Sequence, residues 1–193
     1  LEDSAVFFFG NQRPSVTYMP GSGRAFFGGG DPGNDDTIQI VHIPTLGNAS
    51  DFGNLTVGRY ETDAVGNGTR AIWGGGKYDS TIVDIIDSVE MQSQGNAADF
   101  GDLTAARHKF GVCATSSPTR GVFLGGNDGS RLNVIQYITI ANTGNTTDFG
   151  DLLATNQNQA ACSSSVRGVA AGGYTGSASN VIQYITIAST GDA

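Results

Sequence analysis

Four in-register repeats dominate the sequence and restrict the fold more than any other feature. Each repeat carries an arginine that precedes a Gly-Gly pair by five residues, and successive arginines lie 46, 50 and 47 residues apart. A period of about 48 residues is typical of propellers and solenoids, in which neighbouring units bury faces that one unit cannot bury alone. The arginines are Arg24, Arg70, Arg120 and Arg167, and the first glycines of the pairs are Gly29, Gly75, Gly125 and Gly172.

Three further segments recur with this period, and all favour strands. β-Branched and aromatic residues dominate the segment after each Gly-Gly loop; residues 133–140 read NVIQYITI, and residues 180–187 repeat these letters. A short Asp-Phe-Gly segment comes next, with its phenylalanine at Phe52, Phe100 and Phe149. The last segment is rich in small residues, which suit a crowded inner strand, and it includes Cys113 and Cys162, interpreted as free core thiols. We predict the strand order inner, Arg-to-Gly-Gly, long, and outer Asp-Phe-Gly.

Composition supports an all-β chain. Glycine contributes 29 residues and charged residues only 15%, and no segment shows a sustained 3.6-residue apolar period with caps. We therefore expect no helices and a single domain over residues 1–193, with repeats at about 12–54, 55–102, 103–151 and 152–193. Residues 5–11 match the outer-strand phase, so we expect them to supply the missing outer strand of the last unit and close a ring of four. The alternative is a four-unit excerpt of a longer ring.

Charge excludes several classes of partner. The net charge is −8, and the ten basic residues are scattered, so we expect no binding to nucleic acid or to anionic membrane surfaces. No apolar run approaches the roughly 18 residues of a membrane span, so we expect no membrane insertion. The two histidines, His42 and His108, occupy different phases of the repeat, which makes a metal or catalytic role improbable. We expect neither metal nor cofactor.

The recurring residues resemble kelch-type β-propeller repeats. Phe52, Phe100 and Phe149 stand where that family usually has tryptophan. Arg59 and Arg107 match the arginine that leads into the next blade, and Asn156 departs from this pattern. The sequence motif [TA]DFGDL, followed by a serine-rich turn, Arg-Gly-Val-Phe and Gly-Gly, is also similar to motifs in repeat proteins of marine bacteriophages. These resemblances imply four-stranded blades and a place in a virion or tail fibre.

Several recurring motifs have a catalytic interpretation that the rest of the sequence does not support. Asp-Phe-Gly occurs in kinases, but the phosphate loop and the other kinase motifs are missing. The Gly-Gly pairs lack the Gly-Lys-Ser/Thr of a phosphate-binding loop, so we expect them to permit unusual backbone conformations or close approach. We expect the phenylalanines to fill the core between neighbouring blades. We expect the repeated arginines to bond carbonyls or a carboxylate between blades rather than to line a ligand site.

Candidate binding residues lie in the loops after Gly-Gly, which diverge most between repeats and would emerge on one face of a propeller. Tyr78 and Tyr174 suit stacking on a sugar ring or packing on a protein partner. Three aspartates of the first loop offer oxygen ligands to a hard cation, although a solvated acidic loop is favoured. The candidates are Asp31, Asp35, Asp36, Lys77, Tyr78, Asn127, Asp128, Arg131 and Tyr174.

These expectations describe a non-enzymatic structural and adhesive module on the surface of a phage virion. Its partners would be other virion proteins or further copies of the chain, and its loops would contact a host surface glycan or protein. The alternatives are a secreted lectin-like or protein-docking kelch module and, less favoured, a carbohydrate-active enzyme.

Overall fold

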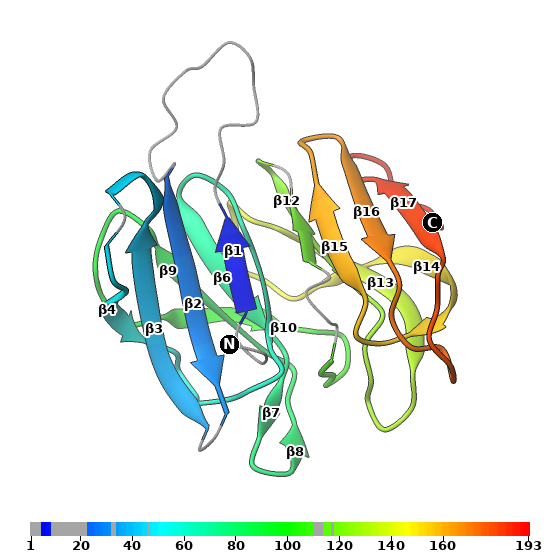
Figure 1. The fold of residues 1–193 in the computed structure, drawn as a ribbon, viewed down its shortest axis with the longest axis horizontal. Helices are drawn as coiled ribbons and strands as arrows, with labels where there is room; N and C mark the ends of the chain where they lie inside the picture. The colour runs from blue at the N-terminus through cyan, green and yellow to red at the C-terminus, as the bar shows by residue number, and fades with distance from the viewer. Residues whose placement is uncertain (1–4, 9–22, 32–33, 46, 110–113, 117) are drawn as a thin grey trace.

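The computed structural model describes residues 5–8, 23–31, 34–45, 47–109, 114–116 and 118–193, and this part of the chain is all-β. It holds three four-stranded antiparallel sheets, one three-stranded antiparallel sheet and a two-stranded hairpin (Figure 1). The one helical element in these ranges is a 3₁₀ turn, η1 (Ile43–Thr45). No helix in them has the length and apolar character needed to cross a membrane.

Each sheet corresponds to one repeat, and the first sheet also takes in β1, which precedes its repeat. The first sheet contains β1 (Ala5–Phe8), β2 (Arg24–Gly30), β3 (Asp35–His42) and β4 (Ser50–Asn54). The second contains β5 (Asp63–Gly66), β6 (Arg70–Gly74), β9 (Ile85–Glu90) and β10 (Ala98–Asp102). The third contains β11 (Ala114–Ser116), β12 (Arg120–Leu124), β13 (Leu132–Thr139) and β14 (Thr147–Asn156). The fourth contains β15 (Ala160–Ser163), β16 (Arg167–Ala171) and β17 (Ile182–Thr186), and the hairpin pairs β7 (Lys77–Tyr78) with β8 (Thr81–Ile82).

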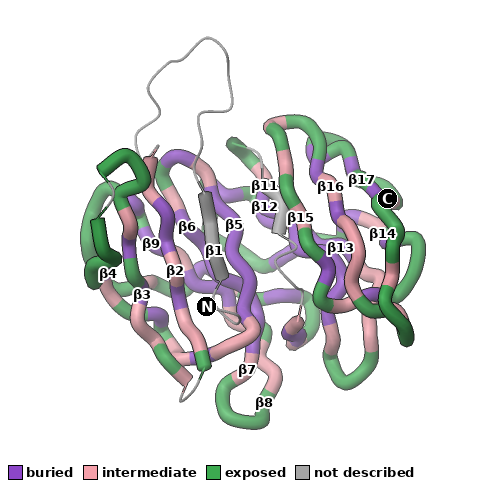
Figure 2. Tube along the Cα trace, in the orientation of Figure 1, coloured by how far each residue is buried: buried purple, intermediate pink, exposed green. Residues whose placement is uncertain are grey.

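The predicted strand order is confirmed in the second and third sheets. In both, the strands pair in the order inner, Arg-to-Gly-Gly, long and outer. The inner strands of consecutive sheets contact one another, β1 against β5, β5 against β11, and β11 against β15. The four sheets therefore fan out from a row of inner strands, β1, β5, β11 and β15 (Figure 2).

The N-terminal strand does not close the last unit, so that prediction is wrong for the described residues 5–8. β1 pairs antiparallel with β2, with Ala5 opposite Gly28 and Phe8 opposite Ala25. It takes the inner position of the first sheet and covers an edge of β2 that would otherwise be open. Residues 9–11 lie outside the described ranges. Within the described part of the chain, the fourth sheet has three strands and the sheets form no closed ring.

A separate apolar cluster fills each space between consecutive sheets. Phe26, Ile38 and Phe52 of the first sheet pack with Trp73 and Met91 of the second. Equivalent residues form the cluster between the second and third sheets and the cluster between the third and fourth. Alternate residues of a strand point to opposite faces of the sheet, so the second and third sheets each contribute side chains to two clusters.

Burial decreases at the end of the series. All four residues of β5 are buried, whereas β15, its counterpart in the fourth sheet, is exposed or half-buried (Figure 2). Cys162 on β15 is exposed, which corrects its interpretation as a buried thiol. Its sheet has a neighbour on one side only among the described residues. Cys113 lies outside them.

The Asp-Phe-Gly strand directs its phenylalanine into the inter-sheet cluster through a bulge. Asp99 lies opposite Asp87 and Gly101 opposite Ile86, so Phe100 has no partner residue across the strand pair. The same shift occurs at the corresponding phenylalanines, Phe52 and Phe149. A bulge re-aims a side chain, and all three phenylalanines are buried.

Candidate functional site

The loops after the Gly-Gly pairs follow equivalent strands and form what we call the loop face. β2, β12 and β16 point the same way in Figure 1. Gly29, Gly75, Gly125 and Gly172 all have positive φ, between 62° and 75°. Such values favour glycine, which allows the chain to turn sharply out of each strand.

A recurring bridge ties these loops to the connections between sheets. Tyr60 bridges Lys77, His108 bridges Asn127, and Gln157 bridges Tyr174. In each pair, the first residue lies between one sheet's outer strand and the next sheet's inner strand, and the second follows a Gly-Gly pair. Lys77, Asn127 and Tyr174 are therefore held by backbone contacts at equivalent places of three sheets.

Two of the three aspartates that were expected in the first loop, Asp35 and Asp36, instead begin β3, and both accept hydrogen bonds. Asp35 Oδ1 accepts a hydrogen bond from the Thr37 amide at 2.9 Å, and Asp36 Oδ2 accepts one from Asn54 Nδ2 at 3.4 Å. Asp31 is exposed. Among the described residues, no three His, Cys, Asp or Glu side chains lie together in a group that could hold a metal ion.

The first and second loops are joined by a pair of hydrogen bonds. Asn34 Nδ2 donates to Asp79 Oδ1 at 2.7 Å, and the Asp79 amide donates to Asn34 Oδ1 at 2.9 Å. The hydroxyl of Tyr60 donates to the Asp79 carbonyl at 2.8 Å. These bonds fix the loop that carries Tyr78, whose side chain is 47% exposed.

The third and fourth loops place an aromatic ring beside a cation and an amide. The Arg131 guanidinium lies 5.5 Å from the centre of the Tyr174 ring, which is 43% exposed. Asn127 Nδ2 donates to Gln157 Oε1 at 2.6 Å. Asp128 is exposed, and its Oδ1 accepts a hydrogen bond from the Ser130 amide. The loop face thus offers two exposed phenol rings with hydrogen-bonding groups near one of them.

A histidine and a glutamate meet where the segments that lead into the second and third sheets come together. His108 Nδ1 lies 2.6 Å from Glu61 Oε2, and Lys109 Nζ lies 3.6 Å from Glu61 Oε1. Burial lowers the pKa of His108 below its usual value; the hydrogen bond to the Glu61 carboxylate opposes this shift, and the charges of Lys77 and Lys109 add to it. The Glu61 carboxylate can only accept a hydrogen bond, so Nδ1–H of His108 is the donor in this contact. This contact ties two sheets together.

The repeated arginines of the Gly-Gly strands bind the next sheet. Arg24 Nη1 donates to the Met91 carbonyl at 2.6 Å. Arg70 Nη1 donates to the Ile140 carbonyl at 3.0 Å and also pairs with Glu90. The equivalent Arg120 donates to the Ile187 carbonyl at 2.9 Å.

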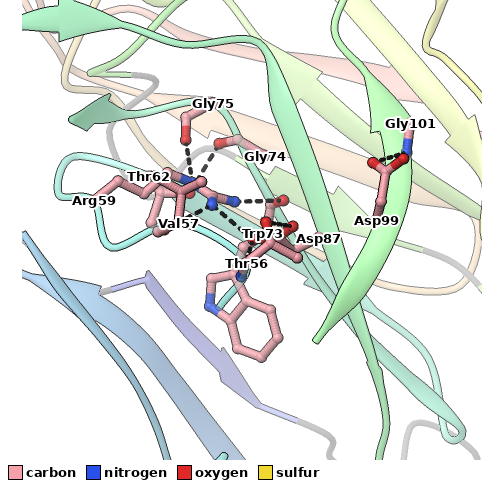
Figure 3. Close-up of polar contacts among 10 residues, drawn as sticks. All are labelled: Thr56, Val57, Arg59, Thr62, Trp73, Gly74, Gly75, Asp87, Asp99 and Gly101. Atoms are coloured by element: carbon pink, nitrogen blue, oxygen red, sulfur yellow. Dashed lines mark hydrogen bonds and ion pairs between the residues drawn. The ribbon is translucent and has the colours of Figure 1, made fainter. Parts of the chain in front are cut away.

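A second set of arginines lies between the sheets and is buried. Arg59 Nη1 pairs with Asp87 at 2.6 Å, and its Nε donates to the Gly75 carbonyl at 2.8 Å (Figure 3). The Asp87 carboxylate also accepts two hydrogen bonds from Thr56, so this fully buried pair is satisfied. Arg107 and Asn156 occupy the same position in the next sheets, and they donate to the carbonyls of Gly125 and Gly172. Asn156, which departs from the expected arginine, keeps the carbonyl contact.

Several of these residues were not singled out from the sequence. Glu61 and Lys109 have φ near +50° without being glycine, so the residue type gives no sign of the turn that brings them together. The polar position shared by Asp87, Gln136 and Gln183 was detectable, because Gln39 stands at the same place in the first repeat and a polar residue therefore recurs there in all four long segments.

No family model matches the chain, and the comparison with curated proteins finds no match.

Proposed function

We propose that the chain is a non-enzymatic, kelch-like propeller module that acts as a structural and adhesive part of a phage virion, and that its loop face binds a host surface glycan. The observation that carries this proposal is the pair of exposed rings, Tyr78 and Tyr174, on loops anchored by the neighbouring sheets. Fixed aromatic rings with one polar end suit recognition, because they give large contact area for little loss of side-chain entropy.

The regular contacts between sheets support the propeller part of the proposal. The first three sheets follow the same strand order, the fourth follows it without an outer strand among the described residues, and each joint has its own apolar cluster and the same arginine-to-carbonyl bond. An array of this kind makes a rigid scaffold, and scaffold rigidity is what positions variable loops for binding.

The structural role is supported by the use of the buried polar groups. Arg59, Asp87, Arg107 and the His108–Glu61 pair all contact backbone or side chains across a joint between sheets. Asn127, Arg131 and Tyr174 lie at the loop face instead, where amide and guanidinium donors flank an exposed ring. Hydroxyl-rich sugars accept hydrogen bonds from such donors while their apolar faces stack on aromatic rings.

A glycan array tests the binding part of the proposal. The wild-type chain should bind a defined set of glycans, the variants Tyr78→Ala and Tyr174→Ala should lose at least tenfold in affinity, and Leu153→Ala should bind normally. Leu153 is 69% exposed on β14, outside the loop face, and serves as the matched control.

The other outcomes separate the alternatives. Turnover of a bound glycan would identify a carbohydrate-active enzyme, and binding to host surface protein with a silent array would identify a protein-docking module. Mass spectrometry of purified phage particles tests the virion setting, which rests on the sequence resemblance; a chain absent from intact particles would contradict it.

A further inference from the structure

The three joints between sheets are copies of one interface. In each joint, an arginine donates to the carbonyl of the residue directly after the next sheet's long strand, which is Met91, Ile140 or Ile187. The outer-strand carbonyl also accepts a hydrogen bond from the next unit, as Phe100 does from Gly144 and Phe149 from Gly191. The chain therefore encodes one docking geometry three times.

The fourth sheet exposes the donor half of this interface. Ile182 occupies the position of Ile38, Ile86 and Ile135, which are fully buried, yet it is 73% exposed. Arg167, the fourth repeated arginine, is exposed, and its guanidinium lies 4.4 Å from the centre of the Tyr184 ring. Tyr184 is itself 55% exposed. We call these three residues, with Ala171, the trailing face.

The first sheet exposes the acceptor half. Ile43 corresponds to Met91, Ile140 and Ile187, and its amide makes the same backbone hydrogen bond, to Gly23, that theirs make to their own sheets. Those three residues are at most 1% exposed, whereas Ile43 is 42% exposed. Ile43, with its carbonyl, and Phe27 form what we call the leading face.

Residue sizes at the joints show that the two faces are complementary. A Cβ on Gly28 would lie 2.7 Å from the Trp73 ring, and one on Gly74 would lie 2.9 Å from the Phe123 ring. At the joint between the third and fourth sheets, the large side chain belongs to the earlier sheet and the small one to the later sheet, because Leu124 packs near Ala170. Each joint thus opposes one large and one small side chain. In the same register the trailing face offers small Ala171 and the leading face offers large Phe27.

We infer that the trailing face of one copy docks on the leading face of a second copy, with Arg167 donating to the Ile43 carbonyl. The two faces belong to the sheets at opposite ends of the long axis in Figure 1, so within the described residues neither face covers the other. Contacts of this head-to-tail kind build rings when the rotation closes and filaments when it does not. The inference does not depend on the proposed function, because it uses sheet faces and leaves the loop face free.

A complementation experiment tests this inference. Sedimentation equilibrium of the wild-type chain should show masses that rise with concentration above the 19.9 kDa of one copy. The variants Ile43→Asp and Ile182→Asp should each stay at the mass of one copy, since each has one damaged face. Mixed in equal amounts, they should form a species of twice that mass and no larger, because only one intact pair of faces remains.

Controls keep the result interpretable. Leu153→Asp places the same charge at a comparably exposed apolar site and should associate as the wild type does. Circular dichroism and thermal melting verify that each variant is folded. A wild-type chain that keeps the mass of one copy at every concentration would overturn the inference. So would mixed variants that fail to associate, or single variants that associate normally.

Discussion

The buried polar position of the long strand serves the backbone of the preceding sheet. Thr56 donates its amide to Asp87, and Leu153 donates its amide to Gln183 Oε1 at 3.0 Å. At the joint between the second and third sheets, Gln136 Oε1 accepts hydrogen bonds from the Thr104 amide and from the Thr146 hydroxyl. An acceptor is needed at this position because a buried amide without a partner is unfavourable by about 1–3 kcal/mol. Asp87 alone of the three acceptors carries a charge, which Arg59 neutralises.

Removing Arg59 should therefore be among the most damaging single changes in the chain. Arg59→Ala leaves the Asp87 carboxylate buried without its cation, so we expect the free energy of unfolding to fall by about 3–5 kcal/mol. Urea denaturation measures this change. Glu90→Ala is the matched control: it removes the exposed ion pair with Arg70 and should change stability by about 1 kcal/mol or less. Equal effects of the two variants would contradict the argument.

The His108–Glu61 contact predicts a pH dependence of stability. Burial lowers the pKa of His108 in the folded state, so the unfolded chain binds a proton more readily when the pH falls below about 6.5. The contribution of His108 is therefore fully present above that pH and is lost as the pH falls towards the lowered folded-state pKa. His108→Gln keeps a donor for Glu61 but cannot titrate.

Denaturation at a series of pH values compares the two chains. Below about pH 6.5, the free energy of unfolding of His108→Gln should decline less steeply than that of the wild type. His42→Gln, the same change at an exposed histidine of the first sheet, serves as the control substitution. Parallel curves for wild type and His108→Gln would show that His108 titrates alike in both states.

At the scale of elements, strand order could be read from the sequence, and the bulge could not. The inner, Arg-to-Gly-Gly, long and outer segments differ in composition, so their places follow from crowding and β propensity. The recurrence of Asp-Phe-Gly marked a shared role without revealing that Phe100 lacks a cross-strand partner. A Cβ on Gly101 would lie 2.5 Å from the Gly144 backbone, a contact between distant segments that a single sequence does not display.

Size matching between sheets leads to a double-substitution prediction. Gly74→Leu alone should lower stability because the new side chain meets the Phe123 ring, and Phe123→Ala alone should lower it by about 3–5 kcal/mol by opening a cavity. Together the changes reproduce the large-and-small pair of Leu124 and Ala170. We expect the double variant to be more stable than the sum of the single effects predicts, by at least about 1 kcal/mol in a denaturation cycle. Additive losses would argue against size matching.

At the scale of the whole molecule, the repeat predicted one sheet per unit, but it could not tell where the chain ends pair. Phe9-Gly10-Asn11 imitates the outer-strand phase, and this likeness led to the wrong prediction of ring closure. Pairing of β1 with β2 prevailed because it joins neighbouring segments and fills the inner place of the first sheet. Local pairing has a smaller loop-closure entropy than pairing across the full chain.

An array of sheets that contact only their neighbours should be least stable at an end that has one neighbour. Residues 133–140 and 180–187 have identical sequences, so their intrinsic rates of amide exchange are matched, while their surroundings differ. Segment 133–140 belongs to the third sheet, which has a neighbouring sheet on each side. Segment 180–187 belongs to the three-stranded fourth sheet, which has one neighbour among the described residues. Because the two segments are identical, they are told apart in peptides that extend into their different flanking residues. At low protein concentration, amide hydrogen exchange should be at least tenfold faster in residues 180–187 than in residues 133–140. Raising the concentration should slow only this segment if copies dock head to tail, whereas equal protection at every concentration would mean that stability is uniform along the array.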